Sequence, residues 1–201
     1  MLKKVVLLTV LVLVLPIAAL ADNQIDFNAN GGTLSGSDAG LSLTGATLIG
    51  VTNFFGLSTV GTNLGSVSFT TGARLTGTLS AGGTFSSSGS SFMIVGNGVN
   101  GVPVGTVFSG SFVGDITLTE SGTSLHNYGL FGVVSGTLST GGTATGPVVL
   151  NFATGKGWMG EPVTVGSVDT TVVVPEPGTL SLFGTGLIGL AGIVRRKLRL
   201  A

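Results

Sequence analysis

Few residues of this chain have side chains that could do chemistry. Its 201 residues include no cysteine and a single histidine, His126. The lack of cysteine excludes disulfides, thiolate metal sites and a cysteine nucleophile. One histidine likewise excludes a multi-histidine metal centre. No G-x-S-x-G nucleophile elbow accompanies His126, so we expect this side chain to hydrogen-bond locally rather than to act as a catalytic base.

Two carboxylates, Asp115 and Glu120, have the residue types of a glycosidase pair. Five positions apart, however, they would point to opposite sides of a regular strand. The sequence therefore predicts no catalytic residue.

The segment Asp26–Gly31 fits the first half of a D-x-[DN]-x-[DN]-G calcium loop, in which alternate side chains point oxygens at the ion. The glutamate that such a loop needs at its twelfth position is replaced by Ser37. Ile25, Phe27 and Ala29 alternate with polar residues, which favours a strand ending in a turn. We expect no metal and no cofactor.

Trp158 is the only tryptophan and lies in the glycine-containing segment 156–162. An exposed indole there would stack on a sugar ring, which makes Trp158 a speculative glycan contact. The alternative is that the indole plugs one end of the folded domain.

The charges are few and unevenly distributed. Charged residues make up 8% of the chain, and between Asp22 and Val174 the only basic ones are Arg74 and Lys156, against seven acidic residues. A duplex-binding surface needs clustered Lys and Arg. Nucleic acid is therefore not an expected partner.

The N-terminal end has the three parts of a secretory signal. Lys3 and Lys4 precede an apolar run, Val5–Leu15, and small residues occupy Ala19 and Ala21. We predict a signal helix in residues 1–21, with signal peptidase cutting after Ala21.

The C-terminal end, residues 175–201, also has three parts. Pro175, Glu176 and Pro177 form a segment that cannot be helical, and sixteen uncharged residues, 179–194, follow it. We predict one short transmembrane helix there. The basic cluster after it would keep the C-terminus in the cytoplasm; its members are Arg195, Arg196, Lys197 and Arg199.

This tail resembles the PEP-CTERM sorting signal of Gram-negative bacteria, which some collections label an ice-binding protein C-terminal domain. The resemblance implies that Pro175, Glu176 and Pro177 are recognised by an exosortase, a membrane transpeptidase that processes the tail. It also implies transient anchoring in the inner membrane, followed by release to the cell surface or the exterior. A plain membrane anchor is the alternative interpretation of the same residues.

Residues 22–174 between the two ends show the alternation of half-buried strands, as in Ser66–Thr70 and Asp115–Thr119. Short strands separated by Gly, Ser, Thr and Asn favour an all-β domain, and we predict an antiparallel β-sandwich or jelly roll. Gly77–Thr84 and Gly136–Thr143 differ at one position, which suggests two equivalent hairpins.

The sequence thus predicts an exported, non-catalytic protein with a structural or adhesive β domain at the cell surface or in an extracellular matrix. Two alternatives remain open: a carbohydrate-binding module for exopolysaccharide, and a secreted hydrolase.

Overall fold

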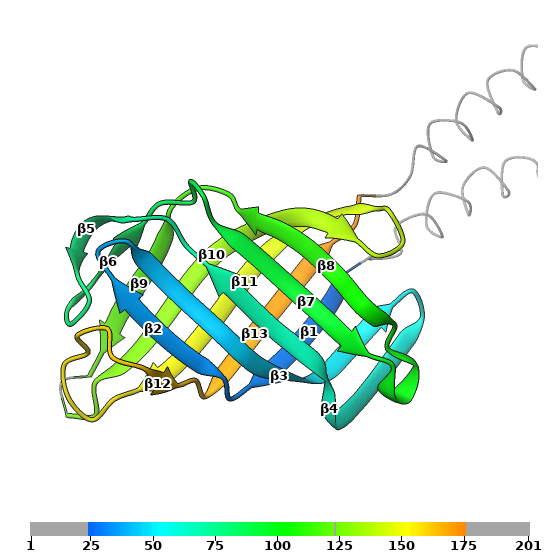
Figure 1. Ribbon diagram of the computed structural model, residues 1–201, viewed down its shortest axis with the longest axis horizontal. Coiled ribbons are helices and arrows are strands. Elements are labelled where there is room, and N and C mark those ends of the chain that lie inside the picture. The colour runs from blue at the N-terminus through cyan, green and yellow to red at the C-terminus, as the bar shows by residue number, and fades with distance from the viewer. Residues whose placement is uncertain (1–23, 123, 176–201) are drawn as a thin grey trace, which may run out of the picture. The chain divides into compact units, whose positions relative to one another are not determined.

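The computed structural model describes residues 24–122 and 124–175 (Figure 1). Within those residues there are thirteen strands and a short 3-10 turn, and no helix that is long and apolar enough to cross a membrane. The expected signal helix and C-terminal helix lie outside the described residues. The elements are β1 (Gln24–Asn30), β2 (Thr33–Ser37), β3 (Gly40–Phe54), β4 (Leu57–Thr70), β5 (Arg74–Thr78), β6 (Gly82–Phe85), β7 (Ser91–Asn97), η1 (Val99–Gly101), β8 (Val104–Phe112), β9 (Ile116–Ser121), β10 (Asn127–Leu138), β11 (Thr143–Ala153), β12 (Val163–Thr164) and β13 (Ser167–Val173).

Eight of the strands form a closed antiparallel barrel. They follow the order β11-β13-β1-β3-β4-β7-β8-β10, and β10 then pairs with β11, so that the sheet meets itself. The closing pair is long and regular, from Asn127 opposite Ala153 to Thr137 opposite Thr143. The prediction of an all-β antiparallel domain is confirmed.

The predicted sandwich is wrong. Alternation shows only that each strand has one apolar face, and this pattern is the same whether two sheets face each other or one sheet curls on itself. The strands are also longer than expected, with 15 residues in β3 and 14 in β4. Three register shifts interrupt the pairing of β3 with β4. Such bulges bend a strand and increase its twist, which helps a sheet to curl and close.

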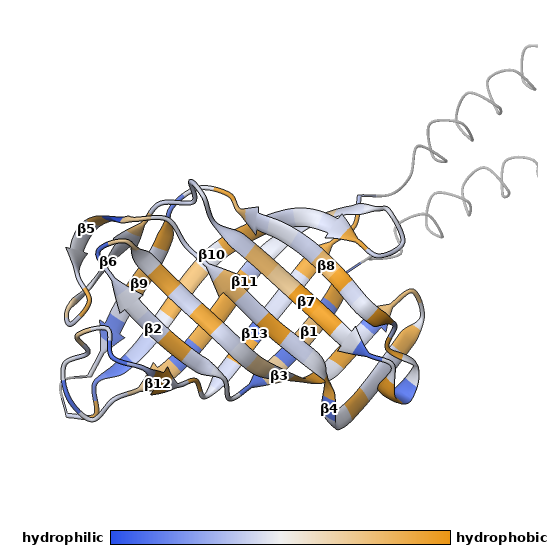
Figure 2. Cartoon of the chain, in the orientation of Figure 1, coloured by the Kyte–Doolittle hydropathy of each residue, from blue (hydrophilic) through white to orange (hydrophobic). Residues whose placement is uncertain are grey.

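The interior of the barrel is filled by the inward faces of the strands. Along β11 every second residue from Ala144 to Phe152 is buried. Figure 2 shows the resulting alternation of apolar and polar bands along the strands. Eight strands leave an interior that side chains can just fill. Within it, neighbouring aromatic rings contact one another with centroids 5.5–6.3 Å apart, in a cluster made of Phe69, Phe92, Phe108 and Phe112.

The two similar sequence blocks both form hairpins, as predicted. Gly136–Thr143 joins β10 to β11 in the barrel wall. Gly77–Thr84 joins β5 to β6, which lies outside the ring of eight and pairs with β9. The similar sequences therefore form hairpins with different registers, since Thr78 pairs with Gly82 whereas Thr137 pairs with Thr143.

The two ends of the barrel differ. One end, which we call the capped end, carries the long connections with β2, β5, β6, β9 and β12. An ion pair joins β5 to the β2–β3 turn at this end, where the Arg74 guanidinium lies 2.6 Å from the Asp38 carboxylate. The other end, which we call the terminal end, carries three connections (β3–β4, β7–β8 and β10–β11), and both Gln24 and Val173 lie there as a paired couple.

Close approach of β8 and β10 requires glycine at Gly110 and Gly136, which stand opposite each other. A Cβ added to Gly136 would lie 2.6 Å from the Cα of Gly110 and 2.8 Å from the ring of Phe108. No real Cβ comes this near to backbone, so a larger residue would force the strands apart.

We expect Gly136→Ala to lower the free energy of unfolding by about 1–3 kcal/mol, the usual cost of overpacking a core. Gly129→Ala, in the same strand, is the matched control, because its added methyl would only touch the side chains of Thr119 and Asn151 at 3.5–3.6 Å. Urea denaturation of both variants measures the difference. An equal loss in both would show that close approach is not the cause.

Candidate functional site

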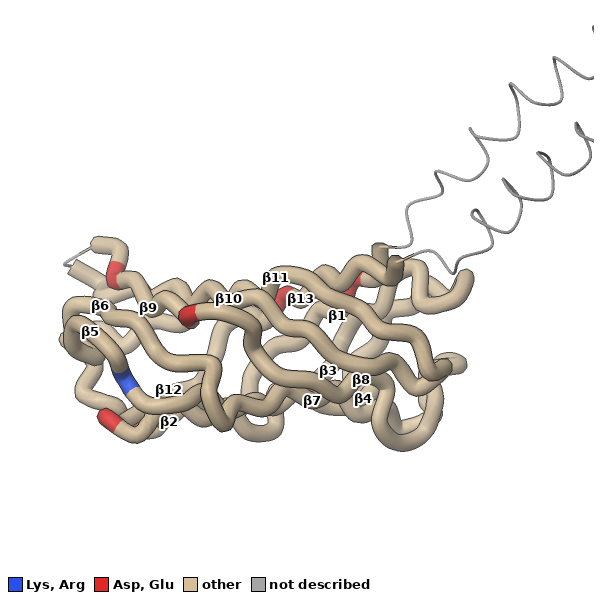
Figure 3. The backbone as a smooth tube through the Cα atoms, turned by 90° about the horizontal axis from the view of Figure 1, so that it is seen from above, with Lys and Arg blue, Asp and Glu red and all other residues tan. Residues whose placement is uncertain are grey.

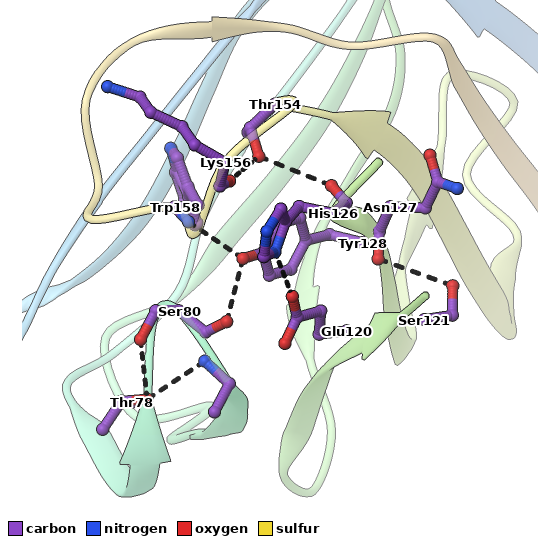
Figure 4. Close-up of polar contacts among 11 residues, drawn as sticks. Thr78, Ser80, Glu120, Ser121, His126, Asn127, Tyr128, Thr154, Lys156 and Trp158 are labelled. Atoms are coloured by element: carbon purple, nitrogen blue, oxygen red, sulfur yellow. Dashed lines mark hydrogen bonds and ion pairs between the residues drawn. The ribbon is translucent and has the colours of Figure 1, made fainter. Parts of the chain in front are cut away.

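Trp158, the predicted glycan contact, is fully buried at the capped end, with 0% of its surface exposed. Its indole packs edge-on against Phe152, with centroids 5.0 Å apart, and against Tyr128 at 6.3 Å (Figure 4). The indole Nε1 donates a hydrogen bond to the carbonyl of Glu161 at 2.8 Å. No ring face is left for a sugar, so Trp158 acts as the plug of the barrel and does not meet the condition for a glycan contact.

Tyr128 holds the plug in place. Its hydroxyl accepts a hydrogen bond from the backbone N–H of Trp158 and donates one to the carbonyl of Ser80, both at 2.9 Å. Its ring stacks on Phe152 at 5.0 Å. One buried side chain thus ties together β10, the β5–β6 turn and the segment that carries the plug.

His126 contacts Glu120 through its Nδ1 atom, across the turn that joins β9 to β10 (Figure 4). Its backbone is left-handed, with φ of 46°, and its N–H donates to the carbonyl of Gly122 at 3.1 Å. Thr154 in turn donates its backbone N–H to the His126 carbonyl at 3.3 Å. Every contact fastens a turn, and none aligns the imidazole with a serine hydroxyl.

Glu161 organises the other side of the plug. Its carboxylate accepts the backbone N–H of Met159 at 2.9 Å and lies 3.2 Å from the Lys156 ammonium. Hydrogen bonds from the backbone N–H groups of Glu161 and Met159, followed by the nearby Lys156, lower the pKa of this carboxyl below its ordinary value of 4.5.

The other residues that were considered for catalysis or metal binding lie apart from one another. Asp115 is exposed just before β9, whereas Glu120 is half-buried near its end and turns to His126. Asp26 lies in β1, where its carboxylate accepts the Thr171 hydroxyl at 2.7 Å, so that the predicted strand is confirmed in place of a calcium loop. Within residues 24–122 and 124–175 no three His, Asp or Glu side chains are arranged to hold a metal.

The sorting motif begins where the last strand leaves the barrel. Val174 packs against the core, and Pro175 is exposed. Glu176, Pro177 and the basic cluster lie outside the described residues, as do Ala19 and Ala21. The structure therefore places the first residue of the motif and leaves the other predicted processing residues untested.

Sequence reasoning missed the contacts of Tyr128 and Glu120. Tyr128 is the only tyrosine in the chain, and its inward position follows from the alternation of β10. Its partner Ser80 is 48 positions away, and only the tertiary fold could bring the two together.

We expect Tyr128→Phe to lower the free energy of unfolding by about 1–3 kcal/mol, because the buried N–H of Trp158 loses its acceptor while the ring contacts remain. Guanidinium denaturation, followed by the fluorescence of the single tryptophan, measures this loss. In the native wild-type protein acrylamide should quench that fluorescence weakly. Strong quenching would contradict the assignment of Trp158 as a buried plug.

The stability that Glu161 contributes should depend on pH. A carboxyl whose pKa is lowered by folding stabilises the protein above its ordinary pKa and loses this effect as the pH falls through the lowered value. Glu161→Gln should therefore lower the melting temperature at pH 7, and the difference from wild type should shrink as the pH falls below the ordinary pKa of 4.5 and vanish once the pH is below the lowered pKa. Asp115→Asn, an exposed carboxylate at the same end, is the control. A gap of constant size at all pH values would contradict this role.

Comparison with known proteins gives one match, and it falls on the tail. Residues 173–197 match the PEP-CTERM protein-sorting motif, which confirms the resemblance drawn from Pro175, Glu176 and Pro177. No curated protein and no solved structure matches the chain. The motif implies that the protein is exported and processed by an exosortase. The chain therefore carries a PEP-CTERM protein-sorting motif, which follows a closed β-barrel in the sequence.

Proposed function

We propose that this protein delivers a passive β-barrel to the cell surface or the extracellular matrix. The N-terminal signal directs export, and signal peptidase removes it after Ala21. The apolar residues 179–194 hold the chain in the inner membrane until an exosortase acts on Pro175, Glu176 and Pro177. The barrel then serves a structural or adhesive role and carries out no catalysis.

The observation that carries this proposal is where the barrel ends. Its last strand, β13, pairs with β1 on one side and β11 on the other, and it is complete at Val173. Val174 adds a contact with the core, and Pro175 is already exposed. Cutting the chain at or after Pro175 would therefore leave every strand of the barrel paired.

The residue types of the motif also suit it to recognition by an enzyme. Proline at Pro175 and Pro177 lacks the N–H of a strand ladder and disfavours helix, so the motif cannot extend β13 at those positions. A transpeptidase needs its substrate segment free of secondary structure. The motif thus meets this need immediately after the folded domain.

The barrel itself has the properties of a passive external domain. Closure of the ring leaves the eight barrel strands without an open edge at which proteins aggregate, and among the described strands only short ones such as β5 and β12 have an unpaired side. Residues 24–175 carry two basic and six acidic side chains, and hydroxyls line much of the outer wall. Pairs of them bond across strands, as Thr70 does with Ser91 at 2.8 Å.

We prefer this proposal to the two alternatives. The carbohydrate-binding module depended on an exposed Trp158, which is buried. The hydrolase depended on a serine–histidine or carboxylate pair; within residues 24–122 and 124–175 His126 contacts Glu120 through Nδ1, and no serine hydroxyl bonds to its imidazole. A polysaccharide contact through the hydroxyl-rich wall is compatible with the adhesive role that we propose.

Replacing Pro175, Glu176 and Pro177 together by alanine tests the sorting step in a host that has an exosortase. We expect the variant to keep its C-terminal tail and to accumulate in the membrane, while the barrel stays folded. Asp169→Asn, which changes an exposed carboxylate in β13, is the control and should be processed like wild type. Normal removal of the tail from the triple variant would contradict the proposal.

A further inference from the structure

The terminal end of the barrel gathers segments that are far apart in the chain (Figure 1). The side-chain amide of Asn53, just before the β3–β4 turn, donates to the carbonyl of Gln24 at 2.9 Å. Asn100, in the β7–β8 connection, donates to the carbonyl of Val60 at 3.2 Å. The end of β3 therefore lies beside the start of β1, which is paired with the end of β13, and η1 lies beside β4 at the same end of the barrel.

This end is uncharged and carries exposed apolar side chains among exposed asparagines, such as Asn53 and Asn97. The exposed fractions are 57% for Phe55, 80% for Val60, 81% for Val104 and 47% for Val173. The three connections at this end, residues 55–56, 98–103 and 139–142, contain no charged residue.

The charges of the described residues gather at the opposite end (Figure 3). Only Asp26 and Asp169, both on the barrel wall, lie away from the capped end. The other six are Asp38, Arg74, Asp115, Glu120, Lys156 and Glu161. Exposed apolar residues at the capped end, such as Leu125, are thus interspersed with charges, whereas those at the terminal end are not.

Phe55 is held outward at the tip of the β3–β4 hairpin by an unfavourable backbone. Its φ is 51° and that of Gly56 is 87°, so both residues of the two-residue turn are left-handed. Such turns prefer Asn, Asp or Gly, and a bulky residue with positive φ is a genuine outlier. The ring packs edge-on against Phe54 at 5.0 Å and still leaves more than half of its surface exposed. Strained residues of this kind cluster at functional sites, so the strain at Phe55 suggests that this residue has a function.

The short connection between the barrel and residues 179–194 limits the distance between the terminal end and a membrane that contains those residues. Four residues separate Val174 from Thr179. Even fully extended, that connection spans no more than about 18 Å. If residues 179–194 are in a bilayer, the terminal end of the barrel must stay near its surface.

We propose that the terminal end rests on the lipid bilayer while the tail is uncut, with Phe55 inserted among the lipid chains and Val60 and Val104 beside it. This inference depends on the proposed membrane anchoring of the tail. An uncharged apolar tip loses no ionic hydration when it enters the interface, and burial of its ring is favourable. The exposed apolar area of this end is too small to hold the barrel on a bilayer by itself. The tail ties the barrel to the membrane and so supplies a high local concentration of this end at the bilayer surface. Cutting the tail therefore frees the barrel.

The test uses the full chain reconstituted in phosphatidylcholine vesicles with and without brominated acyl chains, which quench tryptophan fluorescence on contact. Phe55→Trp places a probe at the terminal end, and Val104→Trp is a second probe should the first variant fail to fold. Leu125→Trp, at a position that is 65% exposed in the wild type and lies at the capped end, is the matched control. The signal of buried Trp158, measured in wild type, is subtracted.

We expect brominated lipid to quench the probe of the Phe55→Trp or Val104→Trp variant several-fold more than that of the Leu125→Trp variant. Flotation of the vesicles separates this inference from the proposal on which it depends. Chains that fail to float with the vesicles would overturn the membrane anchoring itself. Chains that float, but whose probes at the two ends are quenched equally or not at all, would overturn the docking of the terminal end.

Discussion

The structure depends on the pairing of β10 with β11, which closes the sheet into a ring. Once the ring is closed, every inward side chain of eight strands must fit one narrow interior. Ten of the eleven phenylalanines lie in the described residues, and several of them fill that interior in mutual contact. Glycine is needed where two strands approach closely, as at Gly110 and Gly136. Part of the high glycine content of the chain is thus a consequence of this packing.

Closure of the ring also limits the surfaces at which a partner could bind. With the interior filled, only the ends and the outer wall remain, and the two ends have different roles. Trp158 and Tyr128 seal the capped end, and most of the described charged residues lie in the connections around it. The other end is uncharged and holds both ends of the folded chain. The domain can therefore be separated from its sorting tail without loss of a strand.

How much the sequence predicts depends on how local each feature is. The sorting motif is linear, so Pro175, Glu176 and Pro177 could be recognised without a fold. Strand faces follow from alternation in the same way. Whether the sheet closes depends on strand length, bulges and the pairing of β10 with β11, and no local pattern reports these. For the same reason the burial of Trp158 could be given only as one of two alternatives, because it depends on contacts with Tyr128 and Phe152 from other strands. The contact of His126 with Glu120 spans six positions across one turn, which agrees with the local hydrogen bond expected for this side chain.

The central claim is that the barrel is a complete product and that the tail after it is removed. The most direct test is the intact mass of the wild-type protein recovered from its host, measured separately in membrane and culture fractions. We predict a species that begins at Asp22 and ends within residues 175–177, found outside the membrane fraction. A mature species that still carries Arg195 and the residues up to Ala201 would contradict the account.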